Sequence, residues 1–197
     1  MRRRPPRRVL ALCAAFAACG CLESPPGADT PGPAPVDGGG DCPGNLASNG
    51  SFEEGTAGWS PIFATAVRIE AAFGGVYAME ICSDGTSDVE GYYSFDDNPS
   101  AVENPSTEEI YRVRAWVRAG PQTGPQSVEV VIREIDEAGD PHPRGTGVSP
   151  DETWQEVTSM LMVESAAPQS VDVYVASANP MDGNCFHLDE VCVQRVE

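Results

Sequence analysis

Apolar and polar residues alternate with a period of two through much of the chain after residue 110, and helical periodicity is nearly absent. Between residues 111 and 118 one face carries Tyr111, Val113, Ala115 and Val117, and the other carries Arg112, Arg114, Trp116 and Arg118. Successive side chains of a strand point to opposite faces. The segment therefore predicts a strand with one side in a core.

The same alternation recurs in four later segments, at 127–136, 154–163, 171–176 and 186–193. Turn-forming residues separate the segments at 121–126, 138–153 and 177–184. The 138–153 segment contains three prolines and is expected to be a loop. Many short strands without helical crossovers predict an all-β fold, an antiparallel β-sandwich. Residues 42–197 are enough for one such domain with a single core.

A different pattern marks residues 1–21, where five arginines within the first eight positions precede ten apolar residues at 9–18. At about 1.5 Å per residue, this run is too short for a hydrocarbon core about 30 Å thick. It indicates a cleaved export signal. The run also resembles the lipobox of bacterial lipoproteins, in which small residues precede an acylated cysteine. Cys19 follows the better run of small residues, whereas acylation of Cys21 leaves four cysteines downstream that can all pair.

Residues 22–41 are dominated by Pro, Gly and acidic residues, with almost nothing apolar to bury. This composition predicts a disordered, partly extended tether. A lipid on the N-terminal cysteine and a tether behind it would anchor the domain in the bacterial cell envelope, at the outer membrane or cell surface.

The charge of the chain limits the classes of partner that it is expected to bind. The chain has 12 basic residues, all of them arginine, against 30 acidic residues, and its formal net charge is -18. Only seven arginines lie beyond residue 8. The domain therefore lacks the clustered cations that nucleic acid binding needs, and it is not expected to adsorb to anionic lipid. Membrane contact is expected through the N-terminal lipid only.

Four cysteines lie beyond the leader: Cys42, Cys82, Cys185 and Cys192. In an exported protein they are expected to form disulfides, and their spacing is not that of zinc ligands. Four cysteines allow three pairings. If 185–192 is a single strand, Cys185 and Cys192 lie about 23 Å apart at roughly 3.3 Å per residue, beyond disulfide reach. Two pairings remain.

The start of the domain resembles jelly-roll carbohydrate-binding modules of families four, nine and twenty-two. Those modules open with an N-L-x-x-N-G-x-F-E motif, which stands here at 45–53, and a Gly-Trp pair, here Gly58 and Trp59. Further similar motifs follow in order at 75–79, 111–118, 154–157 and 188–191. The resemblance spans nearly all of 45–193. It implies a jelly roll of the galactose-binding-domain-like type that binds polysaccharide or glycan without catalysis.

The resemblance also implies pairings and a metal. The first and last strands of this fold lie antiparallel side by side, which implies that Cys42 bonds Cys192 and that Cys82 bonds Cys185. The family's structural calcium implies that Glu53 and Asp189 hold such an ion. Calcium takes six to eight oxygen ligands and would link the two terminal strands.

Catalysis is not expected. His142 and His187 are the only histidines, and no metalloprotease, nucleophile-elbow or phosphate-loop motif is present. The acidic residues offer many carboxylate pairs, yet no pair stands out as a glycosidase site.

Sugar rings stack on aromatic side chains through their apolar faces, and their hydroxyl groups hydrogen-bond polar side chains. A carbohydrate site is therefore predicted on the polar face of the 111–118 strand, at Trp116 with Arg112, Arg114 and Arg118. Tyr174 lies on the polar side of its own strand, and either Tyr92 or Tyr93 must face outward. Trp59 and Trp154 are expected in the core.

The alternative is an envelope structural or protein-interaction domain with the same fold and no sugar site. In that case the arginines would pair with acidic neighbours such as Glu129 and Asp172.

Overall fold

The computed structural model describes residues 42–88, 90–121 and 126–196. The predictions for the leader, including acylation at Cys19 or Cys21, and for the 22–41 tether lie outside these residues. No helix long and apolar enough to cross a membrane occurs among the described residues.

The described residues form eleven strands and no helix. The strands are β1 (Trp59–Ile62), β2 (Ala64–Ile69), β3 (Ala78–Ser83), β4 (Tyr92–Asp97), β5 (Val102–Glu103), β6 (Ile110–Ala119), β7 (Ser127–Asp136), β8 (Pro141–Val148), β9 (Gln155–Met162), β10 (Pro168–Ala178) and β11 (Cys185–Val196). The predicted all-β sandwich is confirmed.

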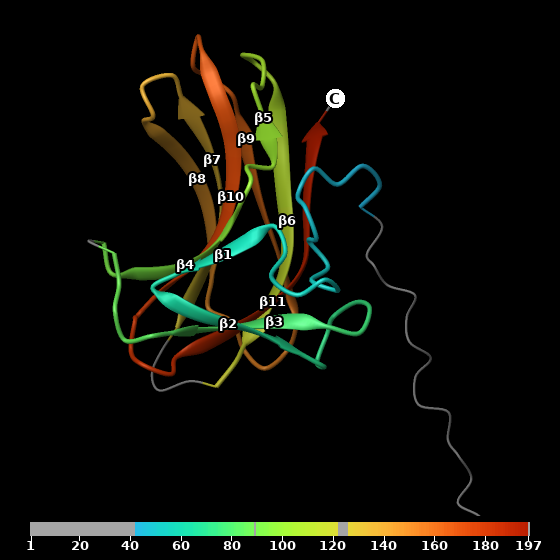
Figure 1. Ribbon diagram of the computed structural model, residues 1–197, viewed down its shortest axis with the longest axis vertical. Helices are drawn as coiled ribbons and strands as arrows, with labels where there is room; N and C mark the ends of the chain where they lie inside the picture. The colour runs from blue at the N-terminus through green and yellow to red at the C-terminus, as the bar shows by residue number, and fades with distance from the viewer. Residues whose placement is uncertain (1–41, 89, 122–125, 197) are drawn as a thin grey trace, which may run out of the picture. The chain divides into compact units, whose positions relative to one another are not determined.

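Two antiparallel sheets make the sandwich. Sheet A has the order β1-β4-β10-β7-β8, with β5 paired to β10, and sheet B has the order β2-β3-β11-β6-β9. In Figure 1, β7 and β8 lie on the left of the view, and β6 and the end of β11 lie on the right. Neighbours in each sheet are mostly distant in sequence, which is the crossed connectivity of a jelly roll.

The core lies between the sheets and consists of the inward faces that the alternation predicts. On β6 the side chains of Tyr111, Val113, Ala115 and Val117 are buried. Their counterparts on β7 and β10 are Val128, Val130, Ile132, Val171, Val173 and Val175. Trp59 and Phe52 close one end of the core with Phe95, in ring contacts of 5.5 to 6.0 Å between centroids. The expectation that Trp59 is a core residue is confirmed.

The expectation of a loop at 138–153 is wrong for its central part. Residues 141–148 form β8, which pairs with β7 along its whole length. Its side chains are exposed apart from half-buried Val148. Prolines are tolerated at a sheet edge because the missing N–H can face solvent. An edge strand without buried side chains shows no alternation of apolar and polar residues, so the sequence does not predict it.

Both implied disulfides are present. Cys42 bonds Cys192, and Cys82 bonds Cys185. The 42–47 segment is not a strand, but it lies along β11, since the Leu46 N–H donates to the Val193 carbonyl at 2.9 Å. The first disulfide therefore ties the start of the domain to its last strand, across 150 residues of sequence.

Candidate functional site: the outer face of sheet A

The outer face of sheet A carries a row of small side chains between larger ones. Ala176 on β10 stands opposite Ser94 on β4 and Glu129 on β7. One step along the sheet, Tyr174 stands opposite Val131. Ala176 and Val131 are almost fully buried although they point outward. The small residues leave a hollow that the side chains around them enclose.

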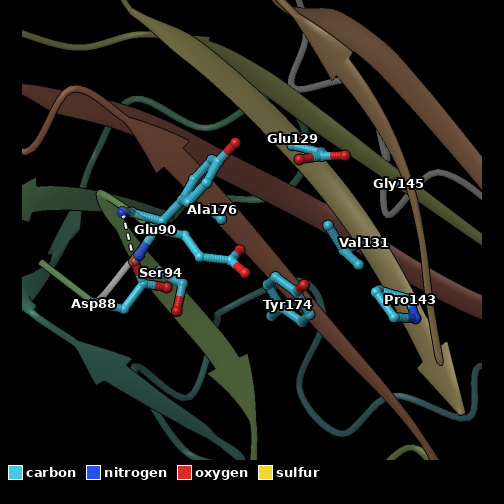
Figure 2. A pocket seen from close by; sticks show the side chains of 10 residues that line it. Asp88, Glu90, Ser94, Glu129, Val131, Pro143, Gly145, Tyr174 and Ala176 are labelled. Carbon is cyan, nitrogen blue, oxygen red and sulfur yellow. Dashed lines mark hydrogen bonds between the residues drawn. The ribbon is translucent and has the colours of Figure 1, made fainter. Parts of the chain in front are cut away.

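This hollow is a cavity of about 240 Å³. Its lining residues are Asp88, Glu90, Tyr92, Ser94, Glu129, Val131, Pro143, Gly145, Tyr174 and Ala176. Figure 2 shows Tyr174, Val131 and Pro143 along one side of it, with Glu129 and Glu90 from two different parts of the chain. Two tyrosines, a proline and several oxygen acceptors thus bound one concavity. We call it the sheet A cleft.

Arg133 contacts the Tyr174 ring on the side that faces away from Ala176. The Arg133 guanidinium lies 4.8 Å from the centre of the ring. Arg133 in turn pairs with Asp172 at 3.2 Å and with Asp96 at 3.7 Å. Burial raises the pKa of Tyr174 above its ordinary value, Arg133 opposes this shift, and the nearby charges of Glu129, Asp96 and Glu90 add to it. The ring is therefore neutral and fixed at neutral pH.

The predicted site around Trp116 lies on the other sheet. The Phe73 ring stacks on Trp116, with centroids 3.7 Å apart and planes at 13°. Trp154 packs edge-on against Phe73 at 6.3 Å. Trp154, expected in the core, is thus half-buried in an outer cluster on sheet B.

The arginines beside Trp116 differ in their surroundings. Arg118 stacks on Trp154 at 4.7 Å, and its Nε donates to His187 Nδ1 at 3.0 Å. Arg112 is exposed and donates to Gln194 at 3.0 Å, whereas Arg114 is half-buried. The Trp116 surface therefore has a partly covered aromatic group with arginines beside it.

The structure does not bring the five predicted sugar-binding residues together. Trp116 and the three arginines lie on β6 in sheet B, while Tyr174 lies on β10 in sheet A. Outward-pointing Tyr92, predicted as one of two alternatives, lines the sheet A cleft with Tyr174, and Tyr93 is buried. Pro143 and Gly145 also line the cleft and were not predicted from the sequence, because they lie in the segment expected to be a loop.

Glu53 and Asp189, the residues that the resemblance implies as calcium ligands, both accept hydrogen bonds from the backbone of the 73–77 segment. Glu53 Oε1 accepts the N–H groups of Val76 and Tyr77, and Asp189 Oδ2 accepts those of Phe73 and Gly74. Burial raises the pKa of Asp189 to about 6, and the charge of Glu53 adds to this shift. Carboxylate oxygens are ligands that calcium prefers, but both oxygens of Asp189 already accept backbone N–H groups, Oδ2 from Phe73 and Gly74 and Oδ1 from Glu190.

These two carboxylates would need backbone carbonyls or water to complete the ion's shell. The described residues include no group of three His, Cys, Asp or Glu side chains arranged for a metal. Calcium at Glu53 and Asp189 stays a prediction.

The chain is similar in structure to several solved proteins. No family model matches the chain, and no curated protein matches its sequence. Among solved structures, the CBM22-1 xylan-binding domain of Xyn10C from Paenibacillus barcinonensis matches with a TM-score of 0.60 and 17% identity, over 75% of this chain and 92% of that one.

Two other modules match similarly. The C-terminal family 22 carbohydrate-binding module of Clostridium thermocellum Xyn10B has a TM-score of 0.54 and 14% identity, over 75% of this chain and 96% of that one. A family 61 module, TmCBM61, in complex with β-1,4-galactotriose has a TM-score of 0.51 and 18% identity. The match covers 77% of this chain and 99% of that one. At these identities the likeness establishes the fold, which is the jelly roll of carbohydrate-binding modules.

Proposed function

We propose that residues 42–197 form a noncatalytic carbohydrate-binding domain and that the sheet A cleft is its binding site. The observation that carries this proposal is the cavity of about 240 Å³ with Tyr92 and Tyr174 in its lining. The names of the structural neighbours support it: one binds xylan, one was solved with a galactotriose, and the cleft of a third was studied in ligand binding.

The lining has both kinds of group that a sugar ring needs. Aromatic side chains offer flat apolar surfaces for the C–H faces of a pyranose. The carboxylates of Glu90 and Glu129 and the hydroxyl of Ser94 accept hydrogen bonds from sugar hydroxyls. Because Arg133 and its two acidic partners hold Tyr174, little side-chain freedom is lost when a ring stacks on it.

The noncatalytic part of the proposal is supported by structural neighbours that are carbohydrate-binding modules, and the two histidines lie away from the cleft. His142 pairs with Asp136 on β7, and His187 pairs with Glu80 on the outer side of sheet B. Neither residue lines the cleft.

The rival function, a structural or protein-interaction domain, is supported by one observation. At the Tyr174 end of the outer face, Arg133 is paired with Asp96 and Asp172. The cleft lies beyond this group, toward Ala176 and Ser94, and none of the three lines it. The expected pairing of the β6 arginines with Glu129 and Asp172 is wrong, because these two acids lie in the other sheet.

We further propose that the leader and tether place this domain in the cell envelope. Acylation at Cys21, or at Cys19, would anchor the chain, and residues 22–41 would let the cleft reach a polysaccharide at a distance. Metabolic labelling with a palmitate analogue tests this, since labelling lost in Cys21→Ser or Cys19→Ser identifies the acylated cysteine. An unlabelled protein would contradict the anchor.

Affinity electrophoresis against soluble xylan, β-1,4-galactan and mixed-linkage β-glucan tests the binding function. We expect retardation by at least one of these polymers, and we expect Tyr92→Ala to abolish it without changing the melting temperature. A wild-type protein that binds neither these neutral polymers nor a charged polysaccharide would favour the rival function.

A further inference from the structure

Two glutamates face the sheet A cleft and have no hydrogen-bond or ion-pair partner for their carboxylates among the described residues. Glu129 comes from β7, and Glu90 comes from the segment before β4. Asp88, at the same rim, uses Oδ1 to accept the N–H groups of Glu90 and Tyr92.

The position of Glu129 depends on a glycine in the neighbouring strand. Gly145 on β8 stands opposite Val131, and a Cβ atom on Gly145 would lie 2.0 Å from Glu129 Oε1. The bare backbone of Gly145 therefore gives the carboxylate the space in which it lies. The φ angle of Gly145 is not positive, so an L-residue is compatible with the backbone there. Glycine is therefore needed at position 145 for the space it leaves to Glu129, and not for its backbone conformation.

No cationic side chain lines the cleft among the described residues. Arg133 is on the far side of Tyr174 and is already paired with Asp172 and Asp96. Arg144, on the neighbouring strand β8, pairs with Glu164. Three carboxylates therefore bound the cavity with no counter-charge in its lining, in a chain whose net charge is -18.

The aromatic lining suits a cation as well. A tyrosine ring attracts a cation placed over its face, and Tyr174 already receives Arg133 in this way, at 4.8 Å. Carboxylates only accept hydrogen bonds, and their bonds to a charged donor are shorter and stronger than those to a neutral donor. A sugar that carries a small cationic donor group would contact the tyrosine rings through its own ring and the carboxylates through the cationic group. A uronic acid or sulfated sugar would be repelled.

We propose that the sheet A cleft binds glycan units that carry a free primary amine, that is, 2-amino-2-deoxy sugars whose ammonium group lies between Glu129 and Glu90. This inference rests on the proposed function and adds the ligand class. The tyrosines contact the ring, and the two glutamates select the amine over a hydroxyl or an acetamide at the same position.

Three oligosaccharides with the same β-1,4 backbone test the inference. They are hexamers of glucose, N-acetylglucosamine and glucosamine, which differ at C2 in carrying a hydroxyl, an acetamide or an amine. Titration calorimetry of the protein near pH 6 is expected to give the glucosamine hexamer at least a tenfold lower Kd than the other two. The affinity should fall as sodium chloride is added and as the pH is raised through the pKa of the sugar amine.

Matched variants separate a specific site from general attraction to an acidic protein. Glu129→Gln and Glu90→Gln each remove one charge-assisted hydrogen bond and are expected to weaken glucosamine hexamer binding about tenfold. Glu156→Gln is the control, because Glu156 is exposed on β9 in the other sheet. It is expected to leave the Kd unchanged.

Equal weakening by Glu129→Gln and Glu156→Gln would show general attraction and overturn the inference. Equal or tighter binding of the glucose hexamer would overturn the amine preference and leave the proposed function standing. If the wild-type protein bound none of the three hexamers and none of the neutral polymers above, the proposed function itself would fail.

Discussion

Phe73 and Trp116 stack face to face on the outer side of sheet B, with ring centroids 3.7 Å apart. Phe73 belongs to the segment that Glu53 and Asp189 hold through backbone N–H groups. One face of the Trp116 ring is thus in contact with the protein's own phenylalanine.

This stack predicts an energetic coupling between the two residues. In a double-mutant cycle of Phe73→Ala and Trp116→Ala, the coupling in the free energy of unfolding should be about 0.5–1.5 kcal/mol, the range for aromatic pairs. Urea denaturation of the four proteins measures it. Additive single-variant effects would mean that the two rings do not pack in solution.

The contact between Gly145 and Glu129 predicts a position-specific loss of binding. Gly145→Ala should displace the Glu129 carboxylate, because the new Cβ would lie 2.0 Å from Oε1. Affinity for the cleft ligand should fall about tenfold, the effect of losing a hydrogen bond to a charged group.

Gly147→Ala on the same strand is the control, since the nearest atoms to its Cβ would be 3.9 Å away. Calorimetry should show a normal Kd for this variant. Equal losses in both variants would point to a general effect on β8 instead of a displaced Glu129.

The burial of Asp97 leads us to expect that the stability of the protein depends on pH. Burial raises the pKa of Asp97 to about 7, although its Oδ2 accepts the N–H of Ala101 at 2.8 Å. The unfolded value is about 4, so the folded protein binds this proton more tightly. The contribution of Asp97 to the free energy of unfolding therefore falls as the pH rises from about 4 through about 7.

Asp97→Asn should remove this dependence. Because the amide carries no charge, we expect the variant to be more stable than wild type at pH 8 and to lose most of that advantage at pH 5. Chemical denaturation at both pH values gives the comparison. A stability difference that did not change with pH would contradict the raised pKa.

The disulfide between Cys42 and Cys192 predicts a large stabilisation. It closes a segment of 150 residues, and removing a native disulfide costs about 2–5 kcal/mol. The double variant Cys42→Ala, Cys192→Ala should therefore unfold at a clearly lower urea concentration, with the Cys82–Cys185 bond intact by mass spectrometry. An unchanged midpoint would mean that the link adds nothing to the contacts between the 42–47 segment and β11.

Calcium at Glu53 and Asp189 predicts metal-dependent stability. An ion that binds only the folded protein raises the melting temperature by mass action. Added calcium chloride should raise the melting temperature and a chelator should lower it, with no response in Glu53→Gln. A wild-type melting temperature insensitive to both would show that these carboxylates only anchor the 73–77 segment.

Alternation predicted the strands that bury one face. Segments around Val113, Ile132, Leu161, Val173 and Leu188 all became strands with those side chains in the core. The edge strand β8 was not predicted, because nearly all its side chains are exposed and so show no apolar alternation. Pro141 and Gly145 therefore look like loop residues. The disulfide pairing followed from the resemblance once strand length had excluded one of three alternatives.

The candidate site was harder to predict, because alternation tells which face of a strand a residue lies on but not which sheet the strand joins. Trp116 and Tyr174 both point outward, yet from opposite sheets. Phe73 covers Trp116 from 43 positions away along the chain, a contact that no local pattern encodes. The sequence leaves Tyr92 and Tyr93 as alternatives for the outward position, and only the pairing of Tyr92 with Ala178 fixes its direction.

Glycan binding in the sheet A cleft is tested by comparing Tyr174→Ala with Trp116→Ala. Both variants remove one aromatic ring, from opposite outer faces of the sandwich. Affinity electrophoresis on the best-retarding polysaccharide should show that Tyr174→Ala loses retardation and that Trp116→Ala keeps it, with melting temperatures measured alongside. Retardation lost in a folded Trp116→Ala and kept in Tyr174→Ala would show that the site is not the sheet A cleft and would place it on sheet B.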